Sequence, residues 1–417
     1  MDQKKDTDVI IIGAGLAGLT AAKVLKSAGK SVKILEASDA VGGRVRTDQV
    51  NGFLLDRGFQ VLLTAYPETK RFLDYEALEL RAFDSGALIL NRDGITEIGD
   101  PLRKPSSLVP TLLSPAGTFL DKLKMLRLKL QLSRKSIEEI FGEEEITTME
   151  YLKNAGFSDG MINQFFKPFM TGIFLENQLT TSSRMFGFVF KMFSEGNAAV
   201  PAKGMGMIPL QLAEGLSADE LILNESVTAI EGNLLKTRSG STYQATYVLL
   251  ATDQLHLPPP YQQLTTSFQS VTNLYFTASK PPFKQPLIAL NTLPGKLVNN
   301  IAVMDQVSPA YSPNGESLIS VSLIGDSSEE DVVTLQAKAI QELAGWYPDA
   351  VNWKHLRTYQ IRYALPNDDH IHNHLSPEAL RLSEHCFVCG DHLLHGSINA
   401  AMKSGRLAAE AILNSLL

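Results

Sequence analysis

Three glycines near the N-terminus have the spacing of a dinucleotide-binding turn. The stretch VIIIGAGLAGL places Gly13, Gly15 and Gly18 after an apolar, β-branched run and before an apolar helical pattern that ends at Gly29. In G-x-G-x-x-G the first glycine makes the tight turn, the second lets a pyrophosphate approach the backbone, and the third lets helix and strand pack closely. Glu36 ends the next strand pattern about 20 residues on, where a carboxylate can hold a ribose hydroxyl. The stretch predicts dinucleotide binding, and both NAD and FAD fit it.

A second glycine pair lies just beyond this stretch. The segment EASDAVGGRVRT places Gly42, Gly43, Arg44 and Arg46 after the second strand pattern. Paired glycines let a chain pass close to a ligand, and an arginine there can meet a phosphate group. A surface turn with solvated arginines is the alternative interpretation of the same residues.

The C-terminal stretch carries a polar cluster suited to a large cofactor. CGDHLLHGSINAAMKSGRL predicts a strand that ends near Gly390 and Asp391, then a helix that begins near Ser397. A carboxylate at that strand end can accept hydrogen bonds from a polyol chain. The helix N-terminus, with Ile398 and Asn399, can stabilise negative charge that develops on a ring when the ring is reduced.

These motifs together resemble the flavin-containing amine oxidoreductase superfamily, which includes amine and polyamine oxidases, protoporphyrinogen oxidases and phytoene-desaturase-like enzymes. The matching segments are IIGAGLAGL, EASDAVGGRVRT, DRGFQ, YVLLATD and CGDHLLHGSINAAMKSGRLAAEAIL, in the family's order and across essentially the whole chain. FQVLLTAYPE, VPAKGMGMIP and SPAYSPNGESLISVSLIG look closer to the desaturase and protoporphyrinogen-oxidase side than to animal amine oxidases.

The resemblance implies a tightly held FAD. It puts the pyrophosphate on the glycine turn and Arg44, the adenosine ribose on Glu36, and the adenine against the backbone of Val227. It puts the ribityl or pyrophosphate region at Asp391 and the N1/O2 side of the flavin ring at residues 397–399. The implied cofactor-binding residues are Gly13, Gly15, Gly18, Glu36, Gly43, Arg44, Val227, Ala251, Thr252, Gly390, Asp391, Ser397, Ile398 and Asn399.

The resemblance also implies an α/β fold built from interleaved segments. A Rossmann-type FAD-binding domain would be formed by residues 1–80, 200–265 and 375–417, and an α+β substrate domain by residues 81–199 and 266–374. No second G-x-G-x-x-G follows a strand pattern, so no separate NAD domain is expected. Electrons would then leave to oxygen or a quinone.

The substrate side is less defined by the sequence. Gln60, Tyr359 and Tyr363 are the candidates to lie near the substrate, although the two tyrosines also fit ordinary packing. Amine oxidation in the family commonly involves a lysine near flavin N5, whereas Thr272 or Asn273 stands at the corresponding place here.

We therefore predict an FAD-dependent oxidoreductase of the desaturase or oxidase type, which takes a hydride from a bulky, apolar substrate. The aromatic-rich segment 165–193 favours such a substrate, although its aromatic residues would equally form a core. Amine oxidase, porphyrinogen oxidase and redox-neutral flavin-dependent isomerase are the alternatives. No side chain stands out as a catalytic base.

Composition limits the partners and the compartment. The net charge of −7 argues against nucleic-acid binding as the function. The presence of only two cysteines favours a reducing compartment such as the cytoplasm. No apolar run is long enough to span a membrane. Residues 119–141 predict one helix with leucines and six basic residues. This helix would either pack on the core with a solvated basic side or lie on a membrane surface.

Two histidine-containing segments have residue types that can bind a metal, but no metal is predicted. HCFVCGDHLLH holds Cys386 and Cys389, which are expected in a strand, where positions three apart face opposite sides. HIHNH holds His370, His372 and His374 on alternate positions, but a polar loop is the preferred interpretation.

Overall fold

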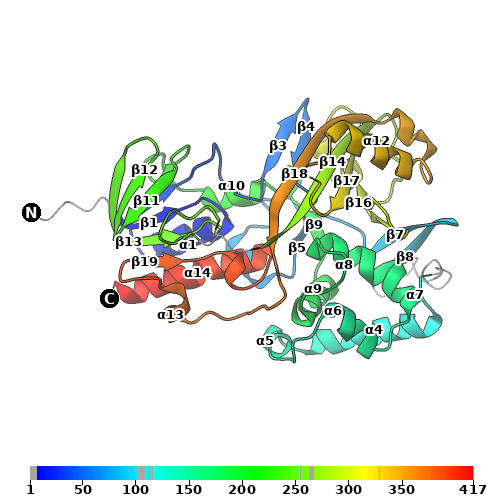
Figure 1. Ribbon diagram of the computed structural model, residues 1–417, viewed down its shortest axis with the longest axis horizontal. Coiled ribbons are helices and arrows are strands. Elements are labelled where there is room, and N and C mark those ends of the chain that lie inside the picture. The colour runs from blue at the N-terminus through cyan, green and yellow to red at the C-terminus, as the bar shows by residue number, and fades with distance from the viewer. Residues whose placement is uncertain are drawn as a thin grey trace, which may run out of the picture.

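The computed structural model describes residues 7–100, 103, 109, 111, 114, 116–253, 255–262, 267–327 and 329–416. The described chain forms two lobes, one around each of two large sheets, and the chain passes between them several times (Figure 1). The predicted domain boundary at residues 265 and 266 lies outside the described residues, and the domain bounds stay a prediction.

The first sheet is the parallel sheet that the glycine motif predicts. Its path is β10–β2–β1–β13–β12–β11, and β19 also pairs with β13. β10, β2, β1, β13 and β19 are parallel, whereas β11 and β12 form an antiparallel hairpin. The strand bounds are β1 Thr7–Ile12, β2 Val32–Leu35, β10 Leu221–Ile222, β11 Val227–Glu231, β12 Leu234–Thr237, β13 Thr242–Leu250 and β19 Cys386–Val388.

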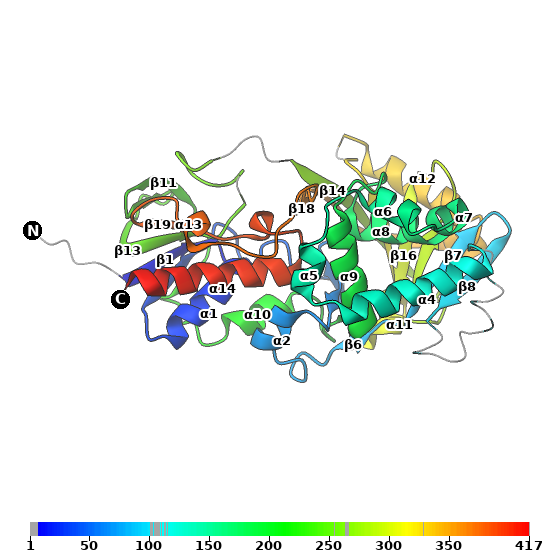
Figure 2. The same cartoon turned by 90° about the horizontal axis from the view of Figure 1, so that it is seen from below.

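Helices cover this sheet, which confirms the predicted Rossmann-type α/β fold class. α1 and α14 run side by side along it in both views (Figures 1 and 2). The bounds in this lobe are α1 Leu16–Ser27, α2 Pro67–Phe72, α10 Met207–Ala213, α13 Pro377–Leu380, the short 3-10 turn η5 Asp391–Leu393 and α14 Ile398–Ser415.

The strand register brings four segments to one edge of the first sheet. Ile12 at the end of β1 pairs with Leu35 on one side and Leu250 on the other, and Leu250 also pairs with Val388. The segments that follow these strand ends hold the glycine turn, Glu36, the 251–252 pair and the 390–391 pair. The carboxyl edge of a parallel sheet is where such folds bind ligands.

The second sheet also has seven strands and is mostly antiparallel. Its order is β18–β14–β17–β16–β15–β7–β8, with one parallel pair, β15 and β7. The bounds are β7 Gly86–Asn91, β8 Gly94–Gly99, β14 Phe268–Ala278, β15 Ile288–Asn291, β16 Val298–Val303, β17 Ser317–Ile324 and β18 Lys354–Pro366. Its helices are α11 Met304–Val307, η3 Pro309–Tyr311, α12 Val332–Leu343 and η4 Pro348–Asn352. Smaller sheets pair β3 Thr47–Val50 with β4 Phe53–Asp56, and β9 Ala198–Val200 with β5 Leu62–Leu63 and β6 Arg81–Ala82.

A helical layer packs beside the second sheet. Its elements are α4 Phe119–Arg134, α5 Ile137–Phe141, α6 Thr148–Asn154, α7 Asp159–Met161, the π-helical turn η2 Ile162–Phe166, α8 Lys167–Phe174 and α9 Ser183–Glu195. The prediction of one helix over 119–141 is wrong. The helix ends at Arg134 because Ser136 and Glu139 form a capping box that begins α5.

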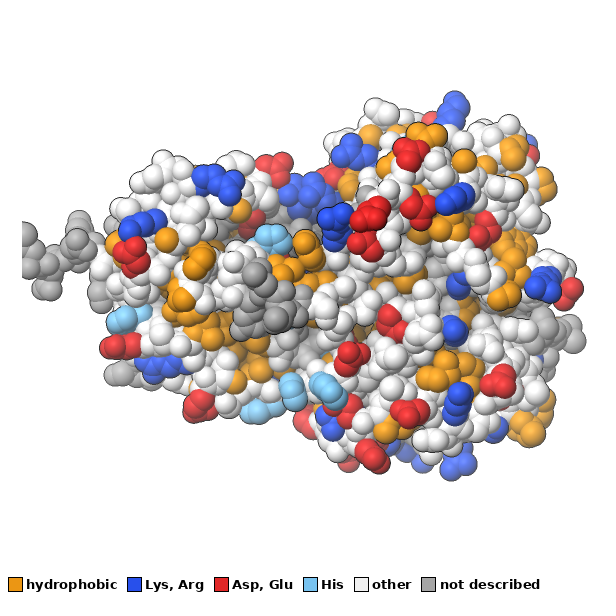
Figure 3. Space-filling view, in the orientation of Figure 1, with side chains coloured by type: hydrophobic (Ala, Val, Ile, Leu, Met, Phe, Trp, Pro, Cys, Tyr) orange, Lys and Arg blue, Asp and Glu red, His pale blue; other side chains and the backbone are white. Residues whose placement is uncertain are grey.

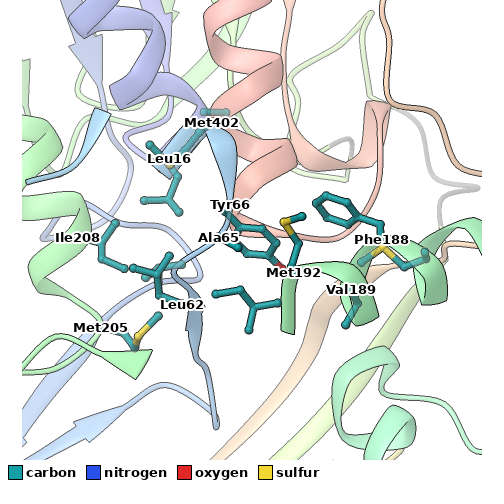
Figure 4. Close-up of a cluster of buried hydrophobic side chains, with 14 of the residues drawn as sticks. Leu16, Leu62, Ala65, Tyr66, Phe188, Val189, Met192, Met205, Ile208 and Met402 are labelled. Atoms are coloured by element: carbon teal, nitrogen blue, oxygen red, sulfur yellow. The ribbon is translucent and has the colours of Figure 1, made fainter. Parts of the chain in front are cut away.

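One hydrophobic core joins the two lobes. Figure 4 shows Leu16 of α1, Met402 of α14 and Ile208 of α10 on one side of Tyr66, and Phe188 and Met192 of α9 on the other side, all in one cluster. The ring of Tyr66, just before α2, stacks on Phe188 with centroids 5.7 Å apart. The lobes are therefore held together by apolar packing between segments far apart in the sequence.

The surface agrees with the charge balance of the sequence. Acidic and basic side chains are interspersed over the face in Figure 3. Within the described part of the chain, no helix combines the length and apolar character needed to cross a membrane.

The closest helix contact in the first lobe yields a stability prediction. A Cβ on Gly405 of α14 would lie 2.1 Å from the carbonyl oxygen of Ala17 in α1. We expect Gly405→Ala to lower the free energy of unfolding by about 1–3 kcal/mol, because overpacking pushes the helices apart. Gly160→Ala is the matched control, since its Cβ would make only ordinary contacts, with the Ser158 Oγ at 3.6 Å and the Gly117 Cα at 4.0 Å. Chemical denaturation measures both variants, and equal stability for them would contradict this account of α1–α14 packing.

Candidate active site

The turn after β1 packs backbone to backbone against the end of β13. Ala251 donates its N–H to the carbonyl of Ile12 at 2.9 Å, so Ala251 and Thr252 lie beside Gly13. A Cβ on Gly13, whose φ is +105°, would lie 2.9 Å from the carbonyl oxygen of Ala251. A Cβ on Gly18 would lie 2.2 Å from the carbonyl oxygen of Gly13. These two glycines are therefore required by the fold itself.

Gly15 differs from its neighbours because it borders open space. A Cβ on Gly15 would meet nothing within 4 Å, and a Cβ on Gly43 would meet only the Cα of Gly15, at 3.4 Å. Gly42 holds the second glycine segment in place by donating its N–H to the carbonyl of Ala14 at 2.8 Å. The two glycine segments thus border one open space at the N-terminus of α1, where a helix favours anions.

Glu36 directs its carboxylate at the same turn. One oxygen accepts the N–H of Ala14 at 2.6 Å, and the other accepts the N–H and hydroxyl of Ser38 at 2.9 and 2.7 Å. The segment that leads into β11 runs beside it, since Glu225 donates its N–H to the carbonyl of Glu36 at 2.8 Å. Val227, at the start of β11, therefore lies two residues beyond a direct contact with Glu36.

Arg44 links the N-terminal glycine segment to the C-terminal motif. Its guanidinium donates to Asp391 Oδ1 at 2.5 Å and to the carbonyl of Ala364, at the end of β18, at 3.1 Å. Gln60 donates its amide N–H to the Arg44 carbonyl at 2.9 Å, while its own side-chain oxygen is buried with no hydrogen-bond partner. Gly390, with φ of +153°, precedes Asp391 and donates its N–H to Ser404 Oγ at 3.0 Å.

The N-terminus of α14 is held by two side-chain hydrogen bonds. Ser397 caps the helix by accepting the N–H of Ala400 at 3.0 Å. The side chain of Asn399 accepts the N–H of Glu68 at 3.0 Å and so faces α2. The N–H groups of Ile398 and Asn399 lie in the first helical turn, where no backbone acceptor is available within the helix. The helix terminus itself, rather than the Asn399 side chain, is what this turn offers to a ligand.

Asp368 is a positioning residue that the sequence analysis missed. Its carboxylate accepts the N–H of Gly396 at 2.9 Å, directly before the α14 cap. Burial raises the pKa of Asp368 to about 7, although the Gly396 N–H opposes the shift and nearby Asp391 adds to it. A carboxylate in the acidic pair of PNDDHIHNH gives no local signal that it is buried, because such a segment is typical of a surface loop.

His395 lies at the junction of the lobes. Its ring is buried against Phe141 and Phe188, with centroids 5.4 and 5.0 Å away, and Nδ1 lies 3.2 Å from Ser397 Oγ. Burial, with Lys403 nearby, lowers the pKa of His395 to about 3, so the ring is neutral at physiological pH.

Unpartnered polar atoms gather in this region. Gln60 Oε1, His392 Nε2 and His395 Nε2 are buried without a hydrogen-bond partner. Buried polar groups are normally paired, so these atoms are suited to a ligand that supplies the missing partners. Together with the open space at Gly15 and Gly43, they fit a large dinucleotide cofactor such as the FAD implied by the resemblance.

The substrate-side candidates do not form one group. Tyr359 is half-buried and donates its hydroxyl to Asp48 at 2.8 Å, while its ring meets Tyr275 edge-on at 6.1 Å. Tyr363 is 43% exposed and lies against Phe268 near the surface. Thr272 and Asn273, the two candidates for the lysine position, are both buried; Thr272 contacts the Ser327 hydroxyl, and Asn273 donates to Ser320 Oγ at 3.0 Å.

The two histidine-containing segments form no metal cluster, since the described chain has no group of three or more His, Cys, Asp or Glu side chains that could hold a metal ion. β19 ends at Val388, so Cys389 follows the strand rather than lying in it. Both thiols are buried and free, and burial raises the pKa of Cys386 to about 11. HIHNH is a loop, as preferred, with His370 exposed beside Glu145.

Asp56 is a second buried carboxylate that the sequence analysis left without a role, although it begins the quoted DRGFQ motif. It accepts hydrogen bonds from Tyr311 at 2.6 Å, Thr47 at 2.5 Å and the N–H of Met205 at 2.9 Å. Burial raises the pKa of Asp56 to about 6, and these hydrogen bonds oppose the shift. Asp56 thus joins β4 to the second lobe directly ahead of Gln60.

Asp56 gives a pH-dependent stability prediction. An unfolded aspartate has a pKa of about 3.9, so between pH 4 and 7 the folded protein binds more protons at this site. Its contribution to stability is therefore fully present below about pH 4 and is lost as the pH rises through about 6. We expect this loss to be about 3 kcal/mol and to vanish in Asp56→Asn, whose amide oxygen can still accept from Thr47 and Met205.

Tyr311→Phe is the companion variant for this measurement. It removes a donor to the Asp56 carboxylate while keeping the ring, so the pKa of Asp56 rises further and stability falls more steeply with pH. Urea denaturation from pH 4 to 8 measures all three proteins. Parallel pH profiles for them would contradict the assigned role of Asp56.

Comparison with known proteins gives the family. The sequence pattern of the family described as flavin containing amine oxidoreductase matches residues 16–413. Protoporphyrinogen oxidase 2 of Arabidopsis thaliana is 24% identical over 54% of this chain and 50% of that protein, so the match spans about half of the plant enzyme. An L-amino-acid oxidase of Protobothrops flavoviridis is 23% identical over 97% of this chain and 88% of that protein.

A solved structure extends the likeness to the fold. A triple mutant of putrescine oxidase, from a redesign of cofactor binding, has a TM-score of 0.73 and 18% identity, covering 98% of this chain and 99% of that one. The predicted family, fold class and FAD cofactor are confirmed. The chain belongs to the flavin-containing amine oxidoreductase family.

Proposed function

We propose that this protein is an FAD-dependent oxidoreductase that takes a hydride from a bulky, apolar substrate. The observation that carries the proposal is the open space that Gly15 and Gly43 border. The Glu36 carboxylate lies beside this turn, and the chain continues from Gly43 to Arg44, which pairs with Asp391. Bound there, the flavin would supply the two-electron chemistry that amino-acid side chains lack.

The chain's own residues would bind and orient the cofactor. We propose that Glu36 exchanges its contacts at Ala14 and Ser38 for ribose hydroxyls, and that Val227 contacts the adenine through its backbone. The α1 N-terminus and Arg44 would hold the pyrophosphate, with Asp391 on the ribityl side. The N–H groups of the first turn of α14 would stabilise negative charge at the N1/O2 side of the ring.

The helical layer supports an apolar substrate. Phe165 stacks on Phe169 with centroids 5.6 Å apart, and Phe169 lies 5.3 Å from Phe193. All three rings are only half-buried, so they offer aromatic surface rather than a closed core. Neither Thr272 nor Asn273, at the place where the lysine would be expected, provides a cation for amine chemistry. A desaturase or oxidase reaction on a conjugated substrate fits these features better than amine oxidation.

We further propose that oxygen or a quinone accepts the electrons, and that the protein works in the cytoplasm with peripheral contact to a membrane. A bulky apolar substrate is concentrated in bilayers, so such contact would shorten its path to the site. Gln60, beside Arg44, is the substrate-side residue nearest to the proposed flavin position.

The function is tested by the visible spectrum of the purified protein under anaerobic conditions. Carotenoid precursors dispersed in detergent, protoporphyrinogen and polyamines are added one at a time. We expect a flavin spectrum that a conjugated, apolar compound bleaches and that air restores. Bleaching by polyamines alone would assign an amine oxidase, bleaching by protoporphyrinogen alone a porphyrinogen oxidase, and turnover of a compound without net bleaching a redox-neutral isomerase.

Gly15→Ala separates cofactor binding from folding. Because its Cβ meets no atom of the protein, we expect the stability of the flavin-free protein to change by less than about 0.5 kcal/mol. FAD affinity should nevertheless fall by about tenfold or more, since the methyl group occupies the space proposed for the pyrophosphate. Fluorescence titration with FAD and denaturation of the stripped protein measure the two effects.

Gly18→Ala is the contrasting variant for this experiment. Its Cβ would strike the carbonyl oxygen of Gly13 at 2.2 Å, so it should destabilise the flavin-free protein itself. Unchanged FAD affinity in Gly15→Ala would place the pyrophosphate elsewhere.

A further inference from the structure

α4 carries an apolar stripe on the side that faces away from the protein. Phe119, Leu123, Leu126 and Leu130 recur at helical spacing, and they are 63%, 49%, 39% and 46% exposed. The opposite face packs on the core through Leu128 and Leu132. Figure 2 shows α4 crossing the outside of the helical layer with no other labelled element in front of it. The sequence predicts that the exposed side of this helix is basic, whereas the exposed side of α4 is apolar along its centre.

Basic residues border this stripe on both sides. Arg127 and Arg134 are exposed on one border, and Lys122 and Lys129 flank the other. The only acidic residue of the helix, Asp121, is buried in contacts with Thr118 and Ser158. α4 is thus strongly cationic in a chain whose net charge is −7.

The helix is fixed in place before anything docks on it. Thr118 and Asp121 form a capping box, and Asp121 also accepts the N–H of Ser158 at 2.9 Å. Lys129 forms an ion pair with Asp100, the residue that follows the end of β8. A surface that is already ordered loses little conformational entropy when it binds.

We propose that α4 is a docking surface for an anionic lipid bilayer, on which the helix lies flat with Phe119, Leu123, Leu126 and Leu130 inserted among the acyl chains. An apolar face with basic borders is the arrangement that binds membrane interfaces. A second copy of the chain is a less favourable partner for this surface, because contact between the α4 helices of two copies would bring like charges together. The inference deepens the proposed membrane contact and rests on that part of the proposed function.

The test uses the flavin-loaded protein and sedimenting vesicles of phosphatidylcholine, alone or with phosphatidylglycerol. We expect binding to be about tenfold or more stronger with phosphatidylglycerol and to weaken at high salt. Leu123→Gln with Leu126→Gln should reduce binding about tenfold or more, because both leucines are lost from the inserted face. Arg127→Gln with Arg134→Gln should reduce it about fivefold per arginine on anionic vesicles only.

Matched controls change the same residue types elsewhere on the surface. Val333→Gln with Val351→Gln removes exposed apolar side chains, and Lys70→Gln with Lys280→Gln removes exposed cations. Both controls should bind vesicles as the unchanged protein does. Absence of vesicle binding, or equal losses in controls and α4 variants, would overturn the proposal. A dimer that only the leucine variants dissociate would assign the surface to a second copy.

The flavin absorbance of the pelleted protein keeps the two proposals distinguishable. Protein that retains its flavin but stays in the supernatant contradicts the docking surface and leaves the oxidoreductase assignment intact. Protein that pellets but cannot bind FAD contradicts the proposed function and leaves the docking surface intact.

Discussion

Backbone segments approach one another at the start of α1 more closely than any side chain would permit. Gly18 lies against the carbonyl of Gly13, Gly13 against that of Ala251, and Gly405 of α14 against that of Ala17. Because interiors are close-packed, these contacts fix the first helix, the end of β13 and the C-terminal helix as one unit. This unit positions the open space at Gly15, the Arg44–Asp391 ion pair and the first turn of α14.

Residues with a local backbone requirement could be predicted from sequence. A G-x-G-x-x-G turn needs positive φ at its first glycine and close packing at its last, so Gly13 and Gly18 have the expected surroundings. The parallel sheet, the β13 contact at Ala251 and the helix that begins after Ser397 follow from the same kind of local signal. The ligand roles of these residues remain predictions, because their geometry fits FAD without testing each contact.

Residues whose role depends on distant partners could not be predicted. Asp56 accepts a hydrogen bond from Tyr311, which lies between β16 and β17 of the second sheet. Asp368 accepts one from the N–H of Gly396, in the turn before α14. Neither hydrogen bond can be predicted from the residues that neighbour Asp56 or Asp368 in the sequence. The periodicity of the leucines in 119–141 was visible, but a period cannot tell which stripe faces the core. The residues of the capping box, Ser136 and Glu139, are present in the sequence and mark the start of a new helix. Apolar periodicity alone predicts one helix through this position.

The central claim is that the space beside Gly15 and Glu36 binds the adenosine diphosphate half of a flavin dinucleotide. The most direct measurement compares the dissociation constants of FAD and FMN for the flavin-stripped protein, by quenching of flavin fluorescence. The account predicts that FAD binds at least about a hundredfold more tightly, since loss of the adenosine contacts removes several charge-assisted hydrogen bonds. Equal affinities for the two flavins would contradict it, because Glu36 and the glycine turn would then contribute nothing to cofactor binding.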